Sequence, residues 1–122
     1  MGLDLKVAPI KYAKNVAKDW WLARDVLSFD RDYSLFGQIQ RIGNSTVVLN
    51  PVALPAGVEF QWYSDEGIKT LTTDAYGTLL TWVPTHEFGR VNFRHSHSMW
   101  NQVVVQFLTS LPKEMPVVLY WC

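Results

Sequence analysis

The sequence predicts an α+β fold in which a mostly antiparallel sheet is packed by one or two helices. Three observations predict this class. The middle of the chain, from about 58 to 83, holds three strand-like runs separated by turn signals. Apolar residues recur at helical spacing from about 98 to 111. The run "MPVVLYWC" is apolar and β-branched, which favours a final strand over about 116 to 121.

Composition indicates one folded domain spanning residues 1 to 122. Hydrophobic residues make up 48% of the chain and charged residues only 18%. That balance is far from the low hydrophobicity and high charge of disordered chains. A chain of this length can also bury a sizeable core.

The first 30 residues carry weaker signals. "LDLKVAPIKYA" alternates apolar and polar residues around Pro9, which favours an edge strand or an extended lead-in, because proline cannot donate to a sheet. "NVAKDWWLARDVLSF" fits a helix through Val16, Trp20 and Ala23, but it fits strands as well. Both interpretations stay open.

A helix is predicted from about 31 to 42. Tyr33, Phe36 and Ile39 form a helical stripe, Asp30 is a candidate N-cap, and Gly43 with Asn44 supplies a left-handed stop. The β-branched run "STVVLNPV" and the turn "LPAGV" follow.

The central region predicts three antiparallel strands in a meander. "VEFQWY", "IKTLTT" and "GTLLTWV" are separated by the turn signals "SDEG" and "DAYG".

The second helix is predicted from about 98 to 111. Trp100, Val104, Phe107 and Leu111 lie at i, i+4, i+7 and i+11, so this face is expected against the sheet, with Ser98 as N-cap. The competing interpretation is a strand through "QVVVQF". Length and the serine start favour the helix.

Three segments together resemble small proteins encoded by tailed bacteriophages and prophages. They are "RDYSLFGQI" at 31 to 39, "HSHSMW" at 95 to 100, and the closing helix, turn and strand that end in "VVLYW". That group shares an Arg-Asp-Tyr-x-Leu-Phe-Gly motif, a later His-Ser-His-Ser-Trp motif and a final strand rich in valine and aromatic residues. In this chain Met99 precedes Trp100. The resemblance implies a phage or prophage protein, without implying a particular activity.

Charge and cysteine content narrow the partners. The formal net charge is +0, so a nucleic-acid polymer is not expected to bind. Cys122 is the single cysteine, which excludes an intrachain disulfide and favours a reducing compartment. No apolar run reaches the roughly 20 residues of a membrane span. We expect a soluble protein in the host bacterial cytoplasm, because charged residues interrupt any signal sequence: Asp4, Lys6, Lys11, Lys14 and Lys18.

The start of the second helix is a candidate anion site. A helix N-terminus offers unpaired N–H groups, and guanidinium, imidazole and hydroxyl groups adjoin it. "RDYSLFG" adds a guanidinium and a phenol that suit a base or ribose. The alternative is that these side chains cap, pack or face solvent. The candidate ligand-binding residues are Arg94, His95, Ser96, His97, Ser98, Trp100, Arg90, Arg31 and Tyr33.

The histidines also allow a metal site. In a strand, His95 and His97 would share a face, and His86 with Glu87 or Asp74 could complete a zinc-like ligand set. Residues two apart on a helix diverge, so a helix start near Ser96 counts against a shared metal.

We therefore expect a non-enzymatic binding protein without a cofactor, a counter-defence factor that sequesters a small anionic ligand such as a nucleotide second messenger. The alternatives are a metal-dependent hydrolase using His86, His95 and His97, or an inhibitor that binds a host protein. Six tryptophans suggest stacking or interface surface beyond the core. Self-association through the final strand and these rings is expected.

Overall fold

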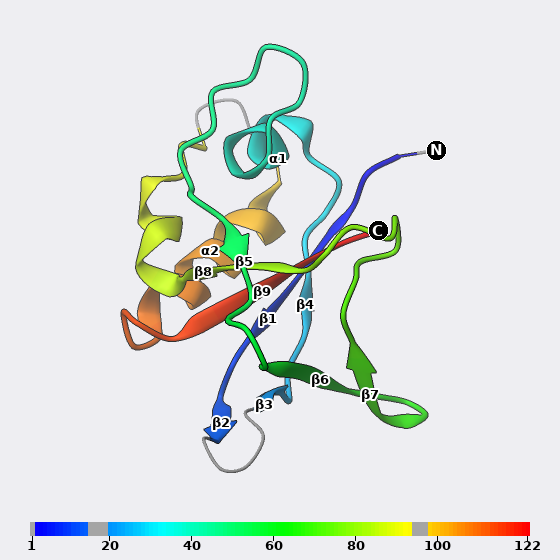
Figure 1. Ribbon diagram of the computed structural model, residues 1–122. Coiled ribbons are helices and arrows are strands. Elements are labelled where there is room, and N and C mark those ends of the chain that lie inside the picture. The colour runs from blue at the N-terminus through cyan, green and yellow to red at the C-terminus, as the bar shows by residue number, and fades with distance from the viewer. Residues whose placement is uncertain (1, 15–19, 94–97) are drawn as a thin grey trace.

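A computed structural model describes residues 2–14, 20–93 and 98–122, and it confirms the α+β class. Within these residues, the strands form two sheets (Figure 1). The five-stranded sheet has the order β4 (Leu27–Ser28), β1 (Leu5–Pro9), β9 (Pro116–Trp121), β8 (Thr81–Pro84) and β5 (Val52–Ala53). The four-stranded sheet has the order β2 (Tyr12–Lys14), β3 (Trp20–Ala23), β6 (Glu59–Ser64) and β7 (Gly67–Leu71). The helices are α1 (Tyr33–Ile39), the 3₁₀ helix η1 (Thr85–Arg90) and α2 (Met99–Ser110).

The predicted final strand is confirmed, but β9 lies inside the sheet rather than at its edge. It pairs antiparallel with β1 on one side and with β8 on the other. β9 therefore offers no free edge for the expected self-association, because both of its hydrogen-bonding edges are occupied. The self-association itself stays a prediction.

β1 is also internal, although Pro9 favoured an edge. The Ile10 amide donates to Pro116 O at 2.8 Å, so the alternation along the strand turns the Pro9 nitrogen towards β4. β4 pairs only with Lys6 and Val7 and does not reach Pro9. The missing N–H of proline therefore costs no sheet hydrogen bond.

The prediction of a central three-stranded meander is confirmed only in part. β6 and β7 form the predicted antiparallel hairpin, but β8 leaves it and pairs with β9 in the other sheet. The cause is the turn between β7 and β8. The Asp74 carboxylate accepts hydrogen bonds from the amides of Tyr76 at 2.9 Å and Thr78 at 3.1 Å. The amide of Ala75, the residue after Asp74, donates to Trp121 O in β9. The sequence left helix and strand both possible for "NVAKDWWLARDVLSF". From residue 20 onward this segment forms strands β3 and β4.

α1 is shorter than expected at both ends. Its N-cap is Asp32 instead of Asp30, and the Asp32 carboxylate accepts from the amides of Ser34 and Leu35. The helix ends at Ile39 because Gln40 is extended. Gly43 has a φ of 57° and lies in a later turn, so it does not terminate the helix.

α2 confirms the predicted helix and its N-cap, since Ser98 Oγ accepts from the Asn101 amide at 3.1 Å. The predicted facing is right for Val104, which is 1% exposed. It is wrong for Trp100 and Phe107, which are 47% and 44% exposed. The buried face consists of Asn101, Val104, Val105 and Leu108.

Two cores lie on opposite faces of the five-stranded sheet. Alternation along β9 directs Val117, Leu119 and Trp121 into the core beneath the helices and Val118 into the core beneath the four-stranded sheet. Five of the six tryptophans are buried or half-buried; Trp100 is the exposed one. None of the helices in the described part of the chain is long and apolar enough to cross a membrane.

Candidate functional site

Residues just before "RDYSLFG" contact residues at the start of α2, about 70 positions later in the sequence. Asn101 is fully buried; its Oδ1 accepts from the Asp30 amide at 2.7 Å, and its Nδ2 donates to Asp30 O at 3.0 Å. Ser98 Oγ donates to Asp30 Oδ2 at 2.9 Å, and Trp100 Nε1 donates to Ser28 O at 2.7 Å. We call these five residues the motif junction. They join the loop before α1, which leads into "RDYSLFG", to the end of "HSHSMW".

Gln38 makes a second connection between the same regions. Its Oε1 accepts from the Asn92 amide at 2.7 Å, and its Nε2 donates to Asn92 O at 2.7 Å. This paired contact resembles a short stretch of sheet made with a side-chain amide. As a result, the chain is held on either side of the segment from Arg94 to His97, by Gln38 before it and by the motif junction after it.

A pocket of about 360 Å³ lies beside α1. Its volume falls within the range of small-molecule sites. Gly37 permits the close approach that shapes it, because a Cβ there would lie 2.8 Å from Ser45 Cβ. Within the described part of the chain, the lining contains hydroxyl and amide groups and no charged side chain: Tyr33, Ser34, Gly37, Gln38, Ser45, Thr46, Val48 and Asn92.

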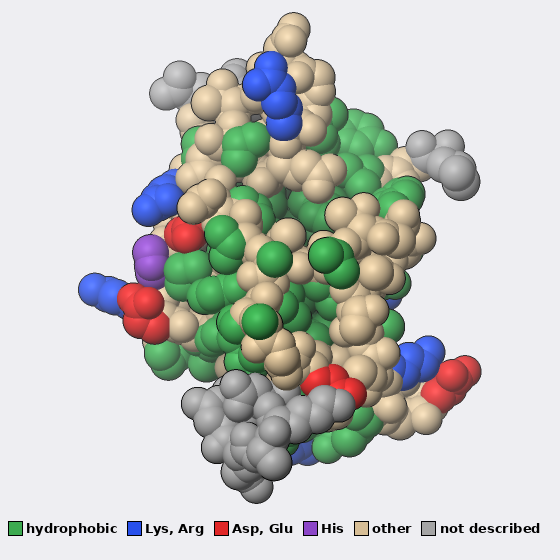
Figure 2. All heavy atoms as spheres, in the orientation of Figure 1, with side chains coloured by type: hydrophobic (Ala, Val, Ile, Leu, Met, Phe, Trp, Pro, Cys, Tyr) green, Lys and Arg blue, Asp and Glu red, His purple; other side chains and the backbone are tan. Residues whose placement is uncertain are grey.

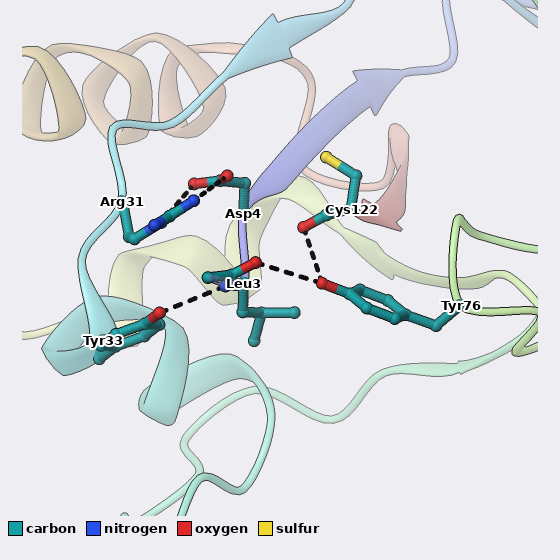
Figure 3. Close-up of polar contacts among 7 residues, drawn as sticks. Leu3, Asp4, Arg31, Tyr33, Tyr76 and Cys122 are labelled. Atoms are coloured by element: carbon teal, nitrogen blue, oxygen red, sulfur yellow. Dashed lines mark hydrogen bonds and ion pairs between the residues drawn. The ribbon is translucent and has the colours of Figure 1, made fainter.

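Arg31 and Tyr33, both predicted ligand residues, contact the two residues just before β1 (Figure 3). Arg31 binds the Asp4 carboxylate through Nε at 3.1 Å and Nη2 at 2.8 Å. Tyr33 Oη accepts from the Leu3 amide at 3.2 Å. Tyr76 Oη donates to the carbonyl of Cys122 at 3.1 Å, which adds the residue after β9 to the group. We call this arrangement the terminal clasp.

The clasp has an electrostatic signature. The hydrogen bond from Arg31 holds the pKa of Asp4 below its ordinary value of 3.8, and the same bond raises the pKa of Arg31. Arg31 is therefore committed to a carboxylate. It is not placed at the N-terminus of α2, where an anion was expected.

An Asp4→Asn variant is expected to lower the melting temperature at neutral pH. The folded-state pKa of Asp4 is lowered, so its contribution to stability is present above 3.8 and is lost as the pH falls below that value. The difference from wild type should therefore shrink in acid. Glu66→Gln, which removes an exposed pair with Lys69 at 3.5 Å, is the matched control and should change little. A difference that is constant with pH would contradict a charge-based role.

Arg90 and the predicted metal ligands of η1 have other partners. Arg90 Nη1 lies 3.7 Å from Glu87 Oε1, and that oxygen also accepts from the Asn50 amide at 2.8 Å. His86 is exposed, and Asp74 caps its own turn. In the described ranges, three or more His, Cys, Asp or Glu residues do not gather where they could hold a metal ion.

Four predicted ligand residues, Arg94, His95, Ser96 and His97, lie outside the described residues. Ser98 lies at the predicted place, but its hydroxyl donates to Asp30 instead of facing an incoming anion. The Asp30 carboxylate thus occupies the positive end of α2. The ligand role of Ser98 is corrected to a structural one. Trp100 is exposed, and its ring nitrogen is bound to Ser28.

Asn101 and Gln38 were not among the residues predicted for the site. A signal for Asn101 was present, because residues 101, 104, 105 and 108 also follow the i, i+3, i+4, i+7 spacing. A single polar residue in such a stripe marks a side chain that needs a buried partner. Gln38 gave no comparable signal, since α1 has only seven residues and is too short for one polar position to stand out from a pattern.

Neither a protein-family model, nor a curated protein, nor a solved structure matches this chain significantly.

Proposed function

We propose that this protein is a non-enzymatic binding protein that sequesters a small nucleotide-like anion between "RDYSLFG" and "NFRHSHSMW". The observation that carries the proposal is the meeting of these regions, through the motif junction and the Gln38–Asn92 contact, beside a pocket of about 360 Å³. A nucleotide has a neutral polar part and an anionic part. The two neighbouring regions offer chemistry for each.

The pocket suits the neutral part. Thr46 offers a hydroxyl, and the half-exposed Tyr33 offers a ring on which a base can stack. The described residues that line it carry no charge, so a base or ribose would not have to displace an ion pair among them.

The anionic part is assigned to Arg94, with His95 and His97 as additional donors. Asn92, the last pocket residue along the chain, is two residues from Arg94. A guanidinium binds phosphate in a paired, charge-assisted geometry. Ser98 is not assigned to the anion, because its hydroxyl already donates to Asp30.

The charge of the protein favours a small ligand over a polyanion. On the face shown in Figure 2, hydrophobic side chains fill much of the centre, and charged side chains of both signs lie mostly towards the margins. The formal net charge of +0 gives the chain no overall positive charge to attract a nucleic-acid polymer. The biological role we propose is that of a phage or prophage counter-defence factor in the host cytoplasm, which rests on the resemblance in sequence.

A panel of cyclic di- and trinucleotides and cyclic ADP-ribose isomers tests the proposal. A cognate ligand present at about 100 times its dissociation constant should stabilise the protein by roughly 2.7 kcal/mol and raise its melting temperature. Loss of one charge-assisted contact in Arg94→Ala should then weaken binding by about 1.5–3 kcal/mol.

Two further variants make the test specific to this site. Thr46→Val keeps the shape of a pocket side chain but removes its hydroxyl, so it should weaken binding of the same ligand. Lys69→Ala removes a cation from the β6–β7 hairpin, which Figure 1 shows at the opposite end of the molecule from α1, and should bind normally. If no nucleotide shifts the melting temperature, or if Lys69→Ala is as damaging as Arg94→Ala, the proposal fails.

A further inference from the structure

A second pocket, of about 310 Å³, lies where the turn after β7 meets the residues before β1 and the end of β9. That volume is at the small end of the range for ligand sites. The pocket shares no described lining residue with the one beside α1. It is lined by Leu3, Gln40, Asp74, Tyr76, Thr78, Leu79, Thr81 and Trp121.

The charged residue of this lining is Asp74, which is only 8% exposed. Its Oδ1 accepts hydrogen bonds from the amides of Tyr76 and Thr78. Within the described part of the chain, its Oδ2 has neither a hydrogen-bond donor nor a cation as partner. Side-chain oxygens of that part that are sealed from solvent all have a partner, so Oδ2 opens to the pocket. A carboxylate that is more than nine-tenths buried and satisfied on one oxygen alone indicates a ligand that brings a positively charged donor.

Three further acceptors line the same pocket. The hydroxyls of Thr78 and Thr81 and the side-chain amide of Gln40 make no hydrogen bond to any of the described residues. An ammonium group carries three donors. It can therefore bind Asp74 Oδ2 and two of these oxygens at once.

The lining favours a single ammonium group over other cations. A divalent metal ion needs several oxygen ligands, and Asp74 is the one acidic side chain among the described residues of the lining. A guanidinium pairs with both oxygens of a carboxylate, but Oδ1 is already occupied by two amides. A diamine would bring a second charge without a second carboxylate. These comparisons leave a primary monoamine.

The apolar residues of the lining suit the body of such an amine. Leu79 and Tyr76 are 67% and 55% exposed, and Trp121 adds aromatic surface at the end of β9. Tyr76 is held in place, because its hydroxyl is hydrogen-bonded to the carbonyls of Gly2 and Cys122 (Figure 3). An apolar or aromatic body in the pocket would remove part of this exposed apolar surface from water, which favours binding.

We propose that this pocket binds a small primary amine with an apolar or aromatic body, whose ammonium group is held by Asp74 Oδ2 and by the hydroxyls of Thr78 and Thr81. The ligand has the opposite charge to the nucleotide-like anion proposed above, and it binds different residues. The two sites are therefore separate binding activities and can be tested independently.

An amide NMR titration of the whole chain with benzylamine tests the proposal. Benzylamine at millimolar concentrations should shift the signals of Tyr76 and Thr78 in a saturable way. Benzyl alcohol has the same ring without the charge and should bind at least about ten-fold more weakly. Putrescine should bind no more tightly than butylamine, because its second ammonium group finds no carboxylate in the described lining.

Asp74→Asn is the decisive variant, because the asparagine oxygen can still accept from the Tyr76 and Thr78 amides and keep the turn. It should weaken benzylamine binding by about ten- to hundred-fold, and circular dichroism would show that it is folded. Thr81→Val keeps the branched shape without the hydroxyl and should weaken binding by about two- to ten-fold. Asp65→Asn changes an exposed carboxylate in the turn between β6 and β7, and this matched control should bind normally.

Three results would overturn the proposal. They are signals that do not shift with benzylamine, benzyl alcohol that binds as tightly as benzylamine, and an Asp74→Asn variant that binds benzylamine as tightly as the wild-type protein. If Asp74→Asn is unfolded, the comparison of the amine with the alcohol and the loss of affinity in Thr81→Val decide the question.

Discussion

A Val104→Asp variant is expected to be largely unfolded under conditions in which the wild-type protein is folded. Val104 is 1% exposed and packs in the core beneath the helices, together with Leu108 and Val117. Burial of a carboxylate there without a partner costs several kcal/mol. Domains of this size are typically stable by about 5–15 kcal/mol, so the substitution removes most of the available stability. Circular dichroism and thermal melting would measure the loss.

The neighbouring Val103→Asp substitution makes this prediction specific to the facing of α2. It introduces the same charge one residue earlier, at a position that is 51% exposed, and should leave the fold intact. Phe107→Asp should also remain folded, although the sequence pattern placed Phe107 against the sheet. A stable Val104→Asp variant, or an unfolded Val103→Asp variant, would mean that α2 is rotated from the arrangement described.

Local patterns predicted the elements whose causes are local. The capping serine and helical spacing identified α2, the turn "SDEG" identified the β6–β7 hairpin, and the apolar run identified β9. The division into two sheets was not predicted, because it depends on contacts between distant residues. The turn after β7 is fixed by the Ala75 amide, which donates to Trp121 O, 46 residues away. No periodicity within 58 to 83 reports that contact.

The facing of α2 illustrates the same limit. Two stripes fit its sequence, one through Trp100, Val104 and Phe107, and one through Asn101, Val104 and Leu108. Hydrophobicity alone favours the first. The second is correct because Asn101 finds two backbone partners at Asp30, which is 71 residues away. A polar side chain with a partner can be buried, and sequence alone does not show the partner.

The candidate site was predicted only in part, because it too depends on contacts between residues far apart in the sequence. The motifs "RDYSLFG" and "HSHSMW" were identified separately, and the structure brings their flanks together at Asp30 and Ser98. The roles of Arg31 and Tyr33 were not foreseen. Their partners, Asp4 and Leu3, reach them because β1 runs beside β9 and β4. That pairing is a property of the sheet as a whole.

The second large effect is expected from Asn101→Ala. This change leaves the Asp30 amide and carbonyl without their hydrogen-bond partners and removes a fully buried side chain. Unsatisfied groups of this kind cost about 1–3 kcal/mol each when they are buried, and water can reach the exposed Asp30 in part. A loss of about 2–3 kcal/mol in the free energy of unfolding follows. Denaturant titration would measure it, and Gln102→Ala, on the half-exposed side of the same turn, is the control.

Asn101→Asp separates hydrogen bonding from packing at this position, because it keeps the shape of the side chain and its acceptor for the Asp30 amide. It loses the donor to Asp30 O and places a carboxylate close to the Asp30 side chain. Burial disfavours the ionised form, so the penalty relative to wild type should be present at neutral pH. It should shrink in acid, where the protonated carboxyl group donates as the amide did. An Asn101→Asp variant as stable as wild type at neutral pH would contradict the paired contact and the motif junction built on it.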